Sequence, residues 1–199
     1  MGTEVKEVEE AKNAMKEGRA AMTKHRARIL NSKMIYEGKV FGVRRDEVEE
    51  PNGLRATREV ITHPGSVVVL PVLKDGRIVM IRQYRHATRQ YLWELVAGRI
   101  DGGEAVKKAA ARELLEETGY QAKRYSVFLD VFPTPGFLEE RMYIVLAEGL
   151  TEGKAQPEED EKIQVRVFVP KELKQMMQRG RIRDAKTIAG LLYYFTFLR

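Results

Sequence analysis

The sequence contains no cysteine in its 199 residues. Neither a disulfide framework nor a thiolate metal site can therefore form, and a reducing compartment is the simpler expectation. Long apolar runs are also absent: no stretch approaches the ~18 residues of a membrane span, and the opening MGTEVKEVEE lacks the apolar core of a secretory signal. Lys6 stands where a myristoylation signal requires Ser or Thr. We expect a folded cytoplasmic protein without a membrane anchor.

The sequence also has no excess of acidic residues: 35 Lys and Arg outnumber 29 Asp and Glu and leave a net charge of +6. Such a balance favours an anionic partner, for example a nucleotide, an RNA or an anionic surface. The excess lies partly in scattered pairs such as Arg44-Arg45, so plain surface solubility is an equal alternative. Charge alone does not indicate nucleic-acid binding, and we expect no nucleic-acid partner.

The mixed order of strands and helices predicts an α+β protein with one main domain and smaller appendages. Residues 1–30 read as a charged helical extension, 31–62 as a small antiparallel β subdomain and 63–199 as the main domain. In the main domain, Asp75-Gly76 predicts a hairpin between two β-branched runs. Further strands are expected at 91–98, 125–132, 141–150 and 163–169, and helices at 104–118 and on both sides of Gly180.

The helix expected at 104–118 carries glutamates where its apolar face should lie. At about 100° per residue, Glu113 and Glu117 fall about 20° on either side of Val106, and Glu116 lies at the edge of the same face. Burying unpaired carboxylates costs several kcal/mol, so these groups must be protonated, paired with basic residues or share a cation. Hard oxygen donors at i and i+4 suit Mg²⁺, with Mn²⁺ as a substitute. A solvated acidic face paired with lysines is the ordinary alternative, and the angular placement argues against it.

The stretch GRIDGGEAVKKAAARELLEETGY, residues 98–120, resembles the Nudix box, G-x5-E-x7-R-E-U-x-E-E-x-G-U, in which U is an apolar residue. The resemblance implies a Nudix fold, with a mixed β-sheet core sandwiched between helices, and hydrolysis of a nucleoside diphosphate linked to another moiety. It also implies that Glu113, Glu117 and the carbonyl of Ala97 are metal ligands. Glu116 would join them or hold a metal-bound water, and so counts among the catalytic candidates. Four further motif residues would have structural roles. Glu104 and Arg112 would form an internal ion pair, and Gly98 and Gly119 would let the backbone enter and leave the motif.

Residues 33–197 are similar to ADP-ribose pyrophosphatases through EGKVFGV, REVITHPGSVVVLPV, IRQYRHA, LWELVAG and TPGFLEER. A proline about fifteen residues beyond the box marks that subfamily, and Pro135 lies sixteen residues after Gly119. A Pro-Gly pair after a strand is also an ordinary turn. The resemblance implies cleavage of ADP-ribose to AMP and ribose 5-phosphate by a homodimer.

Residues of the same segments are candidates for substrate binding. Arg82 and Arg85 have planar forks that suit phosphate, although on an amphipathic strand they could equally be exposed charges. Adenine needs a flat apolar surface, for which Tyr36, Phe41 or Trp93 could serve, and each of these is equally ordinary packing. The remaining candidates, of which the first two could act across a dimer, are Arg58, Glu59, Glu94, Pro135 and Glu140.

The catalytic base is expected on a flexible loop outside the box, in AQPEEDEKI. Glu161 and Glu159 are the candidates, and Glu161 is favoured slightly because it lies closer to the following strand; a solvated acidic loop is the alternative. Three other functions stay open: a Nudix hydrolase acting on GDP-mannose or a UDP-sugar, a Nudix-fold ADP-ribose sensor without cleavage, and an RNA-binding protein. The complete glutamate set argues against a pure sensor.

Overall fold

Two compact units make up the chain, Met1–Thr62 and His63–Arg199. The computed structural model describes residues 26–153 and 163–199. A charged helical extension was expected over residues 1–30, and its residues 1–25 lie outside the described residues. The end of this expectation is wrong, since Arg28 already begins a strand. No helix in the two described ranges is long and apolar enough to cross a membrane.

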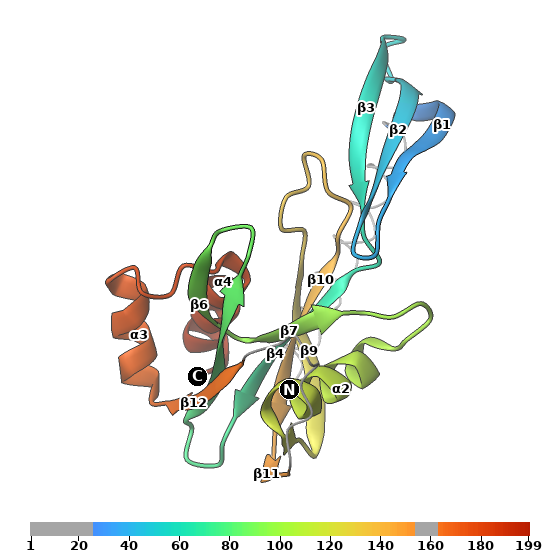
Figure 1. Ribbon diagram of the computed structural model, residues 1–199. Helices are drawn as coiled ribbons and strands as arrows, with labels where there is room; N and C mark the ends of the chain where they lie inside the picture. The colour runs from blue at the N-terminus through green and yellow to red at the C-terminus, as the bar shows by residue number, and fades with distance from the viewer. Residues whose placement is uncertain (1–25, 154–162) are drawn as a thin grey trace, which may run out of the picture. The chain divides into compact units, whose positions relative to one another are not determined.

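The first unit is an antiparallel sheet in the order β1-β2-β3, formed by Arg28–Glu37, Gly42–Glu49 and Arg55–Thr62 (Figure 1). The turn between β2 and β3 closes through Gly53, whose φ of 82° suits glycine. Every residue of β1 is exposed. The small antiparallel sheet expected from the sequence is confirmed, and one of its edge strands contributes nothing to a buried core.

The second unit is built on a mixed sheet in the order β12-β5-β4-β10-β9, with β6 paired to β5 and β7 paired to β4. The pair β4 and β10 is parallel, and the other pairs are antiparallel. The strands are β4 Ser66–Val72, β5 Ile78–Arg85, β6 Gln90–Glu94, β7 Val96–Arg99, β9 Arg124–Val131, β10 Met142–Glu148 and β12 Gln164–Phe168, with a separate pair β8 Tyr120–Gln121 and β11 Thr151–Glu152.

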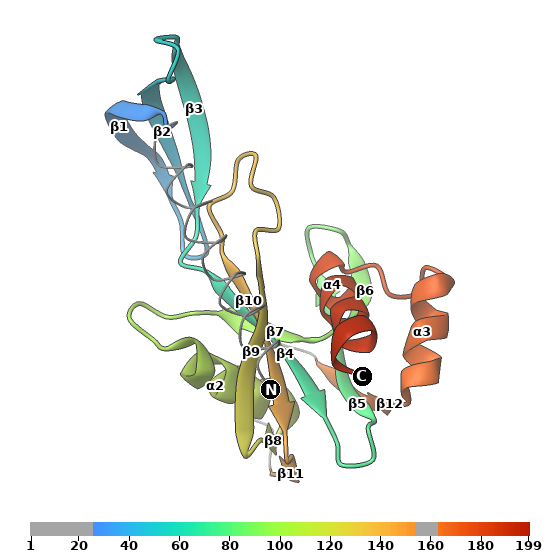
Figure 2. The same ribbon diagram turned by 180° about the vertical axis from the view of Figure 1, so that it is seen from behind.

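Helices cover both faces of this sheet (Figures 1 and 2). Helix α2, Val106–Thr118, packs Leu114 onto the face that carries Val67 and Val69. Helices α3, Pro170–Gln178, and α4, Ala185–Tyr193, cover the opposite face with Ile144 at its centre, and a π-helical segment, Tyr194–Leu198, follows α4. The mixed sheet sandwiched between helices that the resemblance implied is therefore confirmed.

The segment expected as one strand at 91–98 is instead two strands, β6 and β7, separated at Leu95. Strand β4 pairs with β5 only at Val72 and Ile78, and further along the two strands take different partners. The chain pairs with β5 up to Glu94 and with β4 from Val96 onward. Between them, the backbone N–H of Leu95 donates to Oγ1 of Thr187 at 2.8 Å rather than to a neighbouring strand. A side chain of α4 therefore completes the backbone hydrogen bonding at this crossing.

Candidate active site

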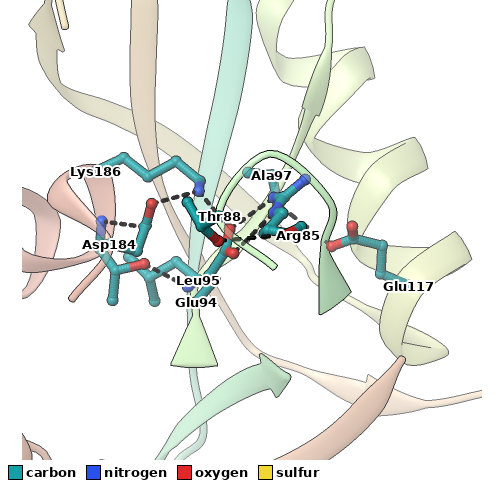
Figure 3. A network of polar contacts seen from close by, with 9 residues as sticks. Arg85, Thr88, Glu94, Leu95, Ala97, Glu117, Asp184 and Lys186 are labelled. Carbon is teal, nitrogen blue, oxygen red and sulfur yellow. Dashed lines mark hydrogen bonds and ion pairs between the residues drawn. The ribbon is translucent and has the colours of Figure 1, made fainter. Parts of the chain in front are cut away.

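Helix α2 brings two of its glutamates against strand β7. Glu117 is 4% exposed, and its Oε2 lies 3.3 Å from the backbone N of Ala97 (Figure 3). The side chain of Glu113 is 12% exposed. Both carboxylates thus face the protein interior from the apolar side of the helix, which ends at Gly119 with a φ of 77° and an N–H donated to the carbonyl of Leu115.

Gly98 leaves the space that the Glu113 carboxylate fills. A Cβ placed on Gly98 would lie 2.0 Å from the carboxylate carbon of Glu113 and 2.0 and 2.3 Å from its two oxygens. No side chain larger than hydrogen fits there while the carboxylate keeps its place. The glycine at the start of the motif therefore admits an acidic group next to the β7 backbone.

Arg112 compensates much of the negative charge on and near the helix. Its Nη2 and Nε contact Glu104 at 3.0 and 3.2 Å, and its Nη1 contacts Glu113 at 2.6 Å and Glu116 at 3.2 Å. The Nη2 also donates to the carbonyl of Arg99 at 2.9 Å. The hydrogen bond from Arg112 holds the pKa of Glu104 below its ordinary value, and the bonds to Glu104 and Glu113 raise the pKa of Arg112. The Arg112–Glu104 pair ties the loop before α2 to the middle of the helix.

The donors at this place suit a divalent cation bound together with its substrate. In the described ranges, no group of three or more His, Asp or Glu side chains is arranged to hold a metal ion. Glu113 and Glu117 instead reach the Ala97–Gly98 backbone as a pair, while Glu116 is 37% exposed and contacts Arg112. Mg²⁺ commonly takes one or two carboxylates and completes its coordination with waters and phosphate oxygens. An open pair of buried carboxylates beside a backbone segment fits that requirement.

A buried ionic network lies beside these donors (Figure 3). Glu94 is 0% exposed and accepts hydrogen bonds from Nε and Nη2 of Arg85 at 2.8 and 2.6 Å, and from Nζ of Lys186. Lys186 also contacts Asp184 at 2.8 Å, and Oδ2 of Asp184 accepts from the backbone N of Thr187 at 2.9 Å. Burial tends to raise the pKa of Glu94, but the hydrogen bonds and charges of Arg85 and Lys186 outweigh it and hold the pKa below 4.5.

The two arginines of strand β5 lie on opposite faces of the sheet. Side chains alternate along a strand, so Arg85 shares the face of Ile81, which packs under α2, and Arg82 shares the face of Met80, which packs under α3 and α4. The hydrogen bond with Glu94 is the main cause of the raised pKa of Arg85, and the charge of Glu117 adds to it, which agrees with the position of Arg85 near the glutamates. Arg82 stacks on the ring of Tyr91, 5.2 Å from its centroid. Of the two, the structure brings only Arg85 to the α2 face.

Other candidate residues lie apart from the glutamates in sequence and have partners of their own. Glu140 accepts from Oγ of Ser66 at 2.5 Å, and Pro135 is exposed in the turn before it. In the first unit, Arg58 pairs with Glu50 and Glu59 pairs with Arg45, each at 2.7 Å. The aromatic candidates are Trp93, which packs edge-on against Phe168, and Tyr36 and Phe41, which contact each other on the first unit. The two candidate bases, Glu159 and Glu161, lie outside the described residues.

Two features of the site escaped the sequence reading. Gln83 is 7% exposed on the same face of β5 as Arg85, and its Nε2 has no hydrogen-bond partner among the described residues. Gln83 lies two residues from both Ile81 and Arg85, and this spacing, which puts all three side chains on one face of the strand, could have identified it. The contacts of Lys186 and Thr187 with Glu94 and Leu95 join positions 92 residues apart, and no pattern in a single sequence indicates them.

Known proteins resemble this chain over both of its units. Residues 62–191 match the family model of the NUDIX domain, and residues 28–61 match that of the nucleoside diphosphate sugar hydrolase N-terminal domain. The chain is 34% identical over 168 residues to the ADP-ribose pyrophosphatase of Bacillus subtilis (strain 168), which covers 83% of this chain and 91% of that protein. It is 38% identical over 174 residues to the ADP-ribose pyrophosphatase of Mycobacterium tuberculosis (strain ATCC 25618 / H37Rv), covering 86% and 84%. A crystal structure of an ADP compounds hydrolase superposes with a TM-score of 0.77 at 26% identity, covering 87% of this chain and 94% of that one.

We predict that Gly98→Ala weakens divalent-cation binding without unfolding the protein. The new methyl group displaces the flexible end of Glu113, so the thermal midpoint should change little while the Kd for Mn²⁺ rises at least about tenfold, or ~1.4 kcal/mol. Electron paramagnetic resonance titration of free Mn²⁺ measures the Kd. Gly102→Ala is the matched control, because nothing lies within 4 Å of a Cβ at Gly102. Equal Mn²⁺ affinity of the two variants would contradict the role given to Gly98.

We also predict that ionised Glu94 stabilises the fold in a pH-dependent way. Because its folded-state pKa is lowered, its contribution is present above the ordinary value of 4.5 and is lost as the pH falls through the folded-state pKa. Glu94→Gln should therefore cost about 3 kcal/mol of unfolding free energy at pH 7 and clearly less near pH 3.5, as measured by urea unfolding. Glu172→Gln, which removes an exposed partner of Arg166, should cost under about 1 kcal/mol at pH 7. A penalty for Glu94→Gln that does not depend on pH would show that the charge of Glu94 is not what stabilises the fold.

Proposed function

The chain belongs to the NUDIX domain family, and we propose that it hydrolyses the diphosphate of ADP-ribose to AMP and ribose 5-phosphate. The observation that carries the proposal is the pair of inward-facing carboxylates, Glu113 and Glu117, held against the Ala97–Gly98 backbone. The names of the two similar ADP-ribose pyrophosphatases support the choice of substrate. We place the activity in the cytoplasm, the compartment expected for a chain without cysteine.

Nudix hydrolases generally require a divalent metal, and we assign Mg²⁺, with Mn²⁺ as a substitute, to this chain. Glu113, Glu117 and the carbonyl of Ala97 would hold it, with Glu116 at the exposed side. When bound, such a cation neutralises diphosphate charge and lowers the pKa of a coordinated water. The carboxylates are acceptor-only groups when ionised, so they bind a cation and repel the diphosphate until one is present.

Arg85 is the protein's own cation for the diphosphate in this proposal. Its Nε and Nη2 are used by Glu94, which leaves Nη1 to donate to a phosphate oxygen. A guanidinium fixed on one edge by a carboxylate loses less rotational freedom when it binds phosphate. Gln83 adds an amide donor on the same face, and its buried Nε2 would gain a partner from the substrate.

Proton transfer is assigned to the segment after β11. A water molecule attacks one phosphorus, the bond from that phosphorus to the bridging oxygen breaks, and a carboxylate accepts the proton of the water. Glu161, or else Glu159, is proposed as this base. Arg82, Arg58, Glu59, Pro135 and Glu140 remain proposed substrate contacts. Glu94, which is 0% exposed, is proposed to act on the substrate through Arg85 and not by direct contact.

The proposal predicts metal-dependent cleavage that fails when Glu117 loses its charge. Purified protein is incubated with ADP-ribose, GDP-mannose, UDP-glucose or NADH, with Mg²⁺ or with EDTA, and the products are separated by anion exchange. AMP and ribose 5-phosphate should form fastest from ADP-ribose and only with metal. Glu117→Gln should lower kcat at least about a hundredfold, with a smaller effect on KM. The exposed Glu172→Gln should leave both constants unchanged.

Other results of this assay have definite meanings. Faster turnover of GDP-mannose or UDP-glucose would replace the substrate and keep the reaction class. Binding of ADP-ribose without any cleavage would make the chain a sensor. Near-normal activity of Glu117→Gln at ordinary Mg²⁺ would remove α2 as the metal platform.

We further propose that the protein is a homodimer assembled through the first unit. Strand β1 exposes apolar side chains, among them Ile29 at 58% and Met34 at 47%, which share one face because they pair with Val48 and Arg44 on β2. Contiguous exposed apolar surface commonly marks an interface. Light scattering after size-exclusion chromatography should give twice the mass of 22.8 kDa, and Ile29→Glu combined with Met34→Glu should shift the mass toward one chain. A monomeric wild type at micromolar concentration would refute the dimer.

A further inference from the structure

We propose that Lys186 and Thr187, at the start of α4, are positioning residues for the active site on the other face of the sheet. They act through Glu94 and Leu95 on Ala97 and Arg85 (Figure 3). The inference deepens the proposed function and rests on it, since Ala97 and Arg85 are assigned there to the metal and the diphosphate.

The first step in this coupling is the hydrogen bond between α4 and Leu95, the residue between β6 and β7. The backbone N of Leu95 donates to Oγ1 of Thr187 at 2.8 Å, and both residues are 0% exposed. A buried N–H without an acceptor is costly, so the backbone at Leu95 is held wherever Thr187 places its hydroxyl. Ala97 follows two residues later on the same chain, in the strand that pairs with β4.

The second step is the ionic contact between α4 and Glu94. Lys186 and Arg85 approach the same buried carboxylate, and Oε2 accepts from both of them. The position of the Arg85 guanidinium is thereby coupled to that of Lys186. Asp184 fixes the other side of Lys186 and also accepts from the N–H of Thr187, so the two positioning residues are held by one capping carboxylate.

The third step is the close seating of α4 on the sheet. A Cβ on Gly190 would lie 3.0 Å from Cδ1 of Leu95 and 3.3 Å from Cγ2 of Ile144. The helix therefore rests directly on the residue that it hydrogen-bonds. Displacement of α4 must displace Leu95, and Ala97 transmits such a shift to Glu117 through the 3.3 Å contact between the backbone N of Ala97 and Oε2 of Glu117.

The test uses backbone amide exchange, measured by nuclear magnetic resonance on the full-length protein without metal. Thr187→Val keeps the shape of the side chain and removes the acceptor, whereas Thr187→Ser keeps the acceptor. Lys186→Met removes the charge, Lys186→Arg keeps it, and Lys171→Met removes an exposed lysine of α3 as the matched control. The Ala97 amide should exchange at least about tenfold faster in Thr187→Val, and at the wild-type rate in Thr187→Ser, Lys186→Arg and Lys171→Met.

Two further readouts separate positioning from simple support of the fold. In Thr187→Val the Kd for Mn²⁺ should rise about fivefold to tenfold and kcat should fall, with KM little changed. In Lys186→Met, by contrast, KM for ADP-ribose should rise, because Arg85 loses its fixed orientation. Lys186→Met added to Glu94→Gln should have almost no further effect on KM, since Lys186 acts through Glu94.

The outcomes distinguish this inference from the proposed function. Faster exchange confined to Leu95, with Ala97 exchange and Mn²⁺ affinity unchanged, would reduce α4 to a structural support and overturn the inference. Additive effects of Lys186→Met and Glu94→Gln on KM would overturn the route through Glu94. A wild-type protein that cleaves none of the diphosphates would refute the proposed function, while Ala97 exchange would still decide whether α4 controls this strand.

Discussion

Compensation of buried negative charge is the constraint on which the second unit depends. Glu94, Glu113 and Glu117 are largely or wholly withdrawn from water, and each would be strongly unfavourable there without partners. Arg112 pairs with Glu104 in the loop before α2 and with Glu113 and Glu116 in the second half of the helix, and Arg85 and Lys186 pair with Glu94. The cations are therefore as much a part of the fold as the apolar core, because Arg85 and Lys186 lower the pKa of the buried Glu94 and Arg112 pairs with the carboxylate of Glu113.

The basic residues are distributed unequally among these carboxylates, and this affects which of them can bind a further cation. Arg112 divides its hydrogen bonds among Glu104, Glu113 and Glu116, whereas Nε and Nη2 of Arg85 both donate to Glu94, which Lys186 also contacts. A carboxylate that shares its arginine can exchange that partner for another cation, whereas one that is doubly paired in a closed interior cannot. The structure thus separates acidic groups suited to ligand exchange from an acidic group suited to holding position.

The sequence allowed the parts of this arrangement that follow from local periodicity to be predicted. The inward direction of Glu113 and Glu117 follows from their angles on the helix, and the hairpin at Asp75-Gly76 follows from its turn residues. The break at Leu95 could not be found in this way, because it depends on β4 and β5 separating and on a hydroxyl from α4. The opposite faces of Arg82 and Arg85 were within reach of strand alternation, but similarity of residue type led us to group the two arginines together.

The contacts of Lys186 and Thr187 with Glu94 and Leu95 have a consequence for how the protein is made. They span 92 positions of the chain, and the later partners belong to the last quarter of the sequence. During synthesis from the N-terminus, strands β6 and β7 and the whole of α2 emerge well before α4 exists. A nascent chain can therefore contain every glutamate of the motif while Leu95 still lacks its acceptor and Glu94 one of its two cations. Formation of α4 then supplies the acceptor for Leu95 and the second cation for Glu94.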